Sequence, residues 1–167
     1  MPLRIAQTGG IHLEQERYFN DTAQCLEWFV EDAIRANTNL FVVNGDLTTY
    51  KQTIQERNLW VDTLIQMGNH APVVLVAGNH GKELDGDLHV LARAKAAHPI
   101  YLCTEPGMIE IGEAAVAVFP YRPRRPEESV LYGVVAGPGA STPKYLVILN
   151  LGGGTSAASR SINSIGS

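Results

Sequence analysis

The chain of 167 residues has the composition of one folded domain, because 45% of its residues are apolar and 18% are charged. This composition excludes a disordered or fibrous protein. A net charge of −4 supplies no overall positive field, so any site for a polyanion has to be a local feature. The two cysteines, Cys25 and Cys103, are expected to be reduced and buried, as in a cytoplasmic protein. We expect neither a secretory leader nor a membrane span.

The first half of the chain contains three short apolar runs, at residues 3–7, 40–43 and 72–77, and a glycine-containing turn follows each of them. Between these runs, residues 18–36 and 51–67 repeat apolar side chains at spacings of three and four, which predicts two amphipathic helices. Trp28 and Trp60 are expected to pack these helices against a sheet. Strands of continuous apolar character separated by helices are typical of a parallel sheet that is buried on both faces.

The later part of the chain contains shorter elements. The patterns predict a helix at residues 87–97, a strand at 100–103, a hairpin of strands at 108–111 and 114–119, a surface loop at 120–128 and a strand at 145–149. Residues 152–167 are rich in serine and glycine and are predicted to be a flexible tail. The sequence therefore predicts one α/β domain over residues 1–151, with a mixed, mostly parallel central sheet and helices on both faces.

Polar side chains follow each of the first three predicted strands. They are His12, Asp46 and the pair Asn79-His80. Loops at the carboxyl ends of parallel strands converge, so we expect these residues on one rim of the sheet. Imidazole nitrogen, carboxylate oxygen and amide oxygen are suitable donors for Mn²⁺, Fe²⁺ or Zn²⁺. The pattern predicts metal-assisted hydrolysis.

The segments that carry these residues, at 5–13, 43–47 and 76–81, resemble the first three motifs of the calcineurin-like metallophosphoesterases. Within that superfamily the resemblance is closest to the SbcD-like DNA repair exonucleases, through the Gly45-Asp46-Leu47 and Gly78-Asn79-His80 loops and the run at 116–121. It covers about residues 1–121. The resemblance implies a metal-dependent phosphodiesterase that acts on DNA or another phosphodiester, with two divalent metal ions, Mn²⁺ first among them.

The resemblance also implies a role for each residue. Asp46 resembles the ligand that bridges the two metals, His12 a ligand of the first metal and Asn79 a ligand of the second. His80 resembles the catalytic residue that contacts the phosphate and donates a proton. An SbcC-like ATPase is the partner that the family implies, through a later region with no counterpart in this chain.

The chain departs from the family pattern at three places. Gly10 stands where the first motif has an aspartate, and the predicted strand at 145–149 is followed by Asn150, a weak candidate ligand, in place of a histidine. No histidine follows His98, so the final motif has no counterpart. With these ligands missing, metal affinity is expected to fall well below that of a complete site.

Several alternatives stay open. The chain is an active phosphoesterase, a degraded or truncated domain that serves as a binding or assembly module, or a rearranged copy whose tail replaces the normal end. His12 could be an ordinary loop histidine, and Asp46 and Asn79 could be turn residues. The remaining candidates are phosphate contacts at Arg122 and Arg124, in a loop that could simply be solvated, and surface or helix-end histidines at His70, His89 and His98.

Overall fold

The computed structural model describes residues 4–80, 87–111, 114–120 and 144–149. Strands and helices alternate in its first part, which contains β1 (Ile5–Thr8), α1 (Phe19–Arg35), β2 (Leu40–Asn44), α2 (Ile54–His70), β3 (Val73–Val76), α3 (Leu88–Leu91) and β4 (Ile100–Cys103). Three more strands follow, β5 (Gly107–Ile111), β6 (Ala114–Phe119) and β7 (Lys144–Leu149). None of the helices described is long and apolar enough to cross a membrane.

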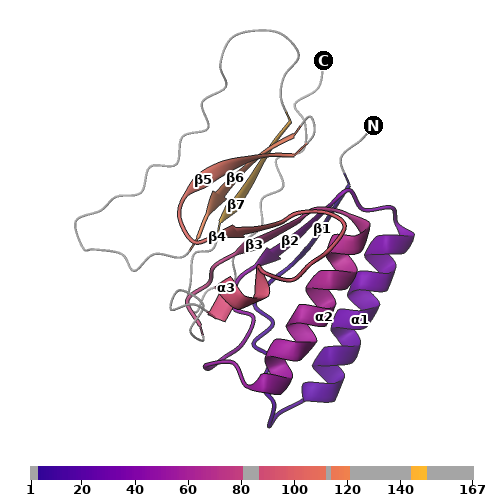
Figure 1. Cartoon of the computed structure of the whole chain (residues 1–167), viewed down its shortest axis with the longest axis vertical. Coiled ribbons are helices and arrows are strands. Elements are labelled where there is room, and N and C mark those ends of the chain that lie inside the picture. The colour runs from indigo at the N-terminus through magenta and orange to yellow at the C-terminus, as the bar shows by residue number, and fades with distance from the viewer. Residues whose placement is uncertain (1–3, 81–86, 112–113, 121–143, 150–167) are drawn as a thin grey trace, which may run out of the picture.

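The first four strands form a parallel sheet in the order β1-β2-β3-β4. Since this order repeats the order along the chain and strand crossovers are right-handed, the connecting helices all fall on one face of the sheet. Figure 1 shows α1 and α2 side by side on that face. One apolar cluster joins the sheet to the helices, with Phe41 and Leu75 from the strands, Val30 and Trp60 from the long helices and Leu88 from α3.

The opposite face of the parallel sheet is covered by a second, three-stranded sheet in the order β5-β6-β7 (Figure 1). Strands β5 and β6 are antiparallel, and β6 and β7 are parallel. Val116 and Val118 of β6 belong to one buried cluster with Leu40, Val42 and residues of β3 and β4. This arrangement places the hairpin directly over the sheet.

The predicted α/β class with a mostly parallel central sheet is confirmed. The structure differs from the prediction of a mixed sheet with helices on both faces in two details: in the described residues the helices cover one face of the parallel sheet, and the hairpin forms a second sheet over the other face. Helices on both faces require the strand order to reverse within the sheet, and this order does not reverse. The continuous apolar runs of β2 and β3 correctly predicted that both faces of these strands are buried, since every residue from Leu40 to Val43 and from Val73 to Val76 is buried. They carried no information about which element supplies the cover.

Three smaller predictions also need correction. The helix predicted at 87–97 is a single turn, Leu88–Leu91, because the next backbone N–H groups, of Arg93 and Ala94, donate three residues back and tighten the chain into a turn. Trp60 is fully buried as expected, whereas Trp28 is 55% exposed on α1. Both cysteines are free, and Cys25 is exposed, contrary to the expected burial.

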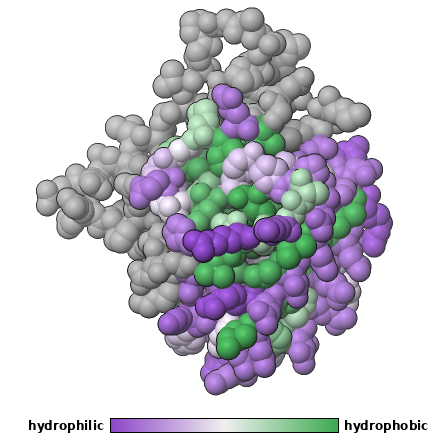
Figure 2. Space-filling model, in the orientation of Figure 1, coloured by the Kyte–Doolittle hydropathy of each residue, from purple (hydrophilic) through white to green (hydrophobic). Residues whose placement is uncertain are grey.

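Figure 2 shows one face of the molecule. The surface of the long helices is mainly hydrophilic there, and hydrophobic side chains lie in the middle of the view.

The predicted tail at 152–167, most of the loop at 120–128, and the candidates Arg122, Arg124 and Asn150 lie outside the described residues. The predicted division of the chain at residue 151 therefore stays a prediction.

Candidate functional site

The loops that leave β1 and β2 continue to run side by side beyond the ends of the strands. The N–H of Gly10 donates to the carbonyl of Gly45 (3.1 Å), and the N–H of His12 donates to the carbonyl of Asp46 (2.9 Å). His12 and Asp46 have φ angles of 50° and 54°, in the left-handed region, where aspartate and histidine occur more often than most residues. The two loops thus bring His12 and Asp46 together.

The carboxylate of Asp46 holds the loop that follows β3. Its Oδ1 accepts hydrogen bonds from the backbone N–H groups of Asn79 (2.8 Å) and His80 (3.1 Å). A Cβ atom at Gly78 would overlap both Oδ1 and the backbone nitrogen of Asp46, so only glycine allows the two loops to approach this closely. The sequence contains Gly78 directly before Asn79, but a glycine in a turn does not reveal that it contacts a residue 32 positions earlier.

The imidazole rings of His12 and His80 meet edge to face, with their centroids 4.4 Å apart and their planes at 89°. Both side chains are half-buried, as are Asp46 and Asn79. The predicted convergence of these four residues at the carboxyl ends of β1, β2 and β3 is therefore what the structure shows. Their individual roles as ligands and catalyst stay predictions.

The donor set fits one divalent ion better than two. Asn79 Oδ1 is buried and has no hydrogen-bond partner, which is unusual for a buried amide and suits a metal ligand. His12 offers an imidazole and Asp46 a carboxylate whose Oδ1 is already shared with two N–H groups. In the described part of the chain, no group of three or more His, Cys, Asp or Glu side chains could hold a metal ion. A second ion would lack charged ligands there.

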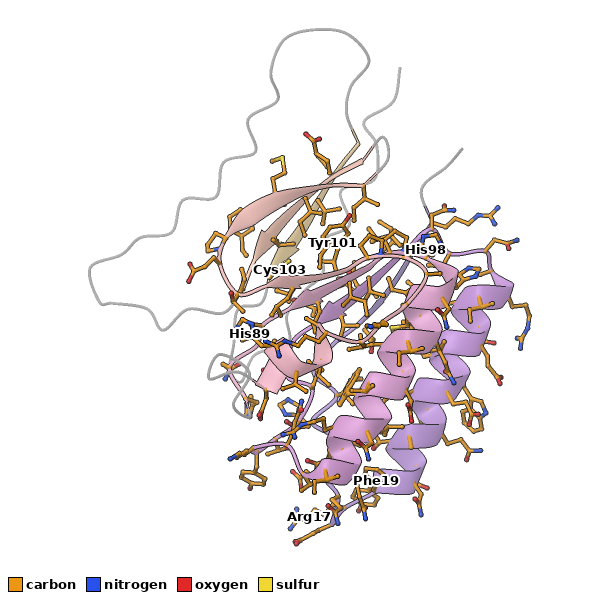
Figure 3. The ribbon with its side chains drawn as sticks, viewed as in Figure 1. Arg17, Phe19, His89, His98, Tyr101 and Cys103 are labelled. Carbon is orange, nitrogen blue, oxygen red and sulfur yellow. The ribbon has the colours of Figure 1, made fainter. Side chains whose placement is uncertain are left out.

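The other histidines lie away from this rim, in agreement with the sequence analysis. His98 is exposed near the ends of the long helices that lie farthest from Arg17 and Phe19, and His89 is exposed on α3 (Figure 3). The ring of His70, in the last turn of α2, packs against Phe41 with a centroid distance of 6.3 Å. None of these residues contributes to the candidate site.

Comparisons with known proteins identify the family. A search of curated protein sequences finds no significant match. Among the solved structures that match is a protein of unknown function, AQ665 from Aquifex aeolicus, with 13% sequence identity and a TM-score of 0.38. The similarity covers 76% of this chain and 65% of that one. The family model described as calcineurin-like phosphoesterase matches residues 3–123, which is well over half of the chain and includes all four residues of the rim. This chain belongs to the calcineurin-like phosphoesterase family.

Proposed function

We propose that this chain is a phosphodiesterase domain of the DNA exonuclease type, similar to SbcD-like proteins, whose site binds divalent metal weakly. Its family consists of metal-dependent phosphoesterases. The observation that carries the proposal is the side-chain Oδ1 of Asn79, which is buried and has no hydrogen-bond partner. The backbone N–H of the same residue is bound to the carboxylate of Asp46. A buried amide oxygen without a hydrogen-bond partner, on a loop that a carboxylate holds in place, is suited to bind a cation.

His12, Asp46 and Asn79 would hold the ion. A divalent ion, when bound, activates water for attack on phosphorus and neutralises charge on the phosphate. His80 lies against His12 and has its backbone N–H fixed by Asp46. These contacts support the role that we assign to its imidazole, which is to donate a proton to a phosphate or leaving-group oxygen. Asp46 therefore acts twice in this proposal, as a ligand and as the acceptor that orients the loop of His80.

A second candidate function is a domain that binds phosphoesters without hydrolysing them. Two observations favour it. Gly10 supplies no side-chain donor, and Oδ1 of Asp46 already accepts two backbone N–H groups. A site with one carboxylate neutralises little of the charge that two divalent ions bring together.

The test is to add the missing carboxylate. No atom lies within 4 Å of a Cβ built at Gly10, and its left-handed φ of 64° is one that aspartate tolerates. We expect Gly10→Asp to tighten Mn²⁺ binding, measured by calorimetry, by about ten- to a hundredfold. We also expect it to raise the hydrolysis of bis(p-nitrophenyl) phosphate and of DNA ends from a low starting rate.

Gly10→Asn is the matched control, because it has nearly the same shape and backbone preference but no charge. It should give a much smaller gain in affinity. Asp46→Ala should abolish the gain in the Gly10→Asp background. Unchanged Mn²⁺ affinity in Gly10→Asp contradicts the proposed site, and tight Mn²⁺ binding without any turnover supports the non-hydrolytic alternative.

A further inference from the structure

The loop between β2 and α2 leaves the candidate site at Asp46 and is fixed along its length. The hydroxyl of Thr48 donates to the carbonyl of Tyr50 at 2.8 Å. The backbone N–H of Gln52 donates to Oδ2 of Asp87 at 3.2 Å. Thr48 and Gln52 are 1% and 5% exposed, so the backbone on both sides of Tyr50 is anchored in the protein.

Tyr50 itself projects from this anchored loop. Its side chain is 72% exposed, and Lys51 beside it is exposed as well. A tyrosine so exposed gains little stability from burial. Because its backbone is already fixed and the side chain has two rotatable angles, it loses little conformational entropy when it binds a ligand.

The position of Tyr50 along the chain limits its distance from the candidate site. Four residues of extended chain span at most about 14 Å, so the Cα atoms of Asp46 and Tyr50 lie within that distance of each other. Each strand of a DNA duplex advances by about 3.4 Å per nucleotide, and an unstacked single strand advances further. The span between the two residues therefore corresponds to about four nucleotides or fewer.

We propose that Tyr50 stacks on a base of single-stranded nucleic acid within a few nucleotides of the phosphate at Asp46, with Lys51 close to the backbone of the same strand. The inference rests on the proposed phosphodiesterase function and adds to it the residue that distinguishes nucleotide substrates from other phosphodiesters. Aromatic side chains bind bases through their π-faces without preference for sequence, and a lysine beside them attracts the phosphates.

The test measures binding without turnover. A fluorescent oligothymidylate and an abasic oligonucleotide of equal length are titrated with the full chain in the presence of a chelator, at low ionic strength, and fluorescence anisotropy is recorded. The chain should prefer the oligothymidylate. Tyr50→Ala should weaken binding of the oligothymidylate by about fivefold or more and remove the preference, whereas Tyr50→Phe, which keeps the ring face, should retain it.

Two further variants serve as controls. Trp28 is also an exposed aromatic, at 55%, but lies within α1, and Trp28→Ala should leave both affinities unchanged. Lys51→Gln should weaken both oligonucleotides equally and lower the salt dependence of binding, by about 0.7 in the logarithmic slope. A chain that binds neither oligonucleotide, or a Tyr50→Ala variant that keeps the preference for bases, overturns the proposal. The binding assay contains a chelator and so does not depend on metal. A chain that fails the hydrolysis assay can therefore still be tested for base stacking by Tyr50.

Discussion

The two ends of the parallel sheet contain the same kinds of polar residue and use them differently. At the carboxyl end, His12, Asp46, Asn79 and His80 are joined by hydrogen bonds and a ring contact. The amino end has a shallow hollow of about 300 Å³ that is also lined by histidines and asparagines. Its described lining residues are Asn37, Thr38, Asn39, His70, Ala71, Pro72 and His98, and none of them is acidic.

The two asparagines of the amino end have structural roles. Asn39 Oδ1 accepts a hydrogen bond from the backbone N–H of Arg4 at 3.0 Å, and the left-handed Asn37, with φ of 53°, follows the end of α1, where such a residue is common. At the carboxyl end, by contrast, His12 and Asp46, which both have a left-handed backbone, join the loops after β1, β2 and β3 by hydrogen bonds. The comparison shows that histidine and asparagine gathered from separate connections do not by themselves indicate a site, because the amino end gathers them without a carboxylate.

The largest expected effect comes from breaking the contact between loops at the carboxyl end. Gly78→Ala places a Cβ against the backbone nitrogen and carboxylate of Asp46. A backbone atom cannot move aside as the tip of a side chain can, so the free energy of unfolding should fall by about 3 kcal/mol. Urea denaturation measures this change.

Gly107→Ala in β5 is the control for this variant. The nearest atom to its Cβ would be the carbonyl oxygen of Glu105, 4.0 Å away, so the free energy of unfolding should change by less than about 0.5 kcal/mol. Equal losses in the two variants would contradict the view that the approach of Gly78 to Asp46 is tightly packed.

A second pair of variants separates buried polar side chains that hold the carboxyl-end loops from those that do not. Glu56 and Gln52 are each 5% exposed. The oxygens of Glu56 accept hydrogen bonds from the backbone N–H groups of Gln15 (2.7 Å) and Thr53 (2.8 Å), so Glu56→Met should lower the free energy of unfolding by about 2 kcal/mol.

Gln52 is expected to behave in the opposite way. Neither polar atom of its side chain has a hydrogen-bond partner, so Gln52→Met should leave stability unchanged or raise it by about 1 kcal/mol. A loss as large as that of Glu56→Met would indicate that the Gln52 amide is bound by water or another ligand.

The smallest effect concerns Cys103, at the end of β4 between the two sheets. Burial raises the pKa of its thiol from the usual 9.0 to about 11, so between these pH values the unfolded chain loses the proton while the folded protein keeps it. Stability should therefore be unaffected below pH 9.0 and fall by about 1 kcal/mol per pH unit above it. The free energy of unfolding of Cys103→Ala, measured over the same pH range, should lack this decline, and an identical decline would contradict the burial.

The sequence predicted the carboxyl end well because its signals are local. An apolar run followed by a glycine turn identifies both the strand and the place where its loop begins, and for parallel strands this is enough to bring His12, Asp46 and His80 together. Features that depend on contacts between distant parts of the chain could not be predicted from local sequence patterns. The cover over the second face of the sheet depends on strand order, and the need for glycine at residue 78 depends on the position of Asp46.

The strand order of the parallel sheet also determines what happens while the chain is being made. Because β1, β2, β3 and β4 are neighbours in the order of synthesis, each strand finds its partner already present. The paired residues are still 27 to 35 positions apart in sequence, and parallel pairing over such separations is slow. The face that carries Leu40, Val42 and Val74 has to wait for β6, which leaves the ribosome several seconds later at roughly 5–20 residues per second. During that interval the nascent chain exposes an apolar sheet surface, which makes it a target for chaperones and for aggregation.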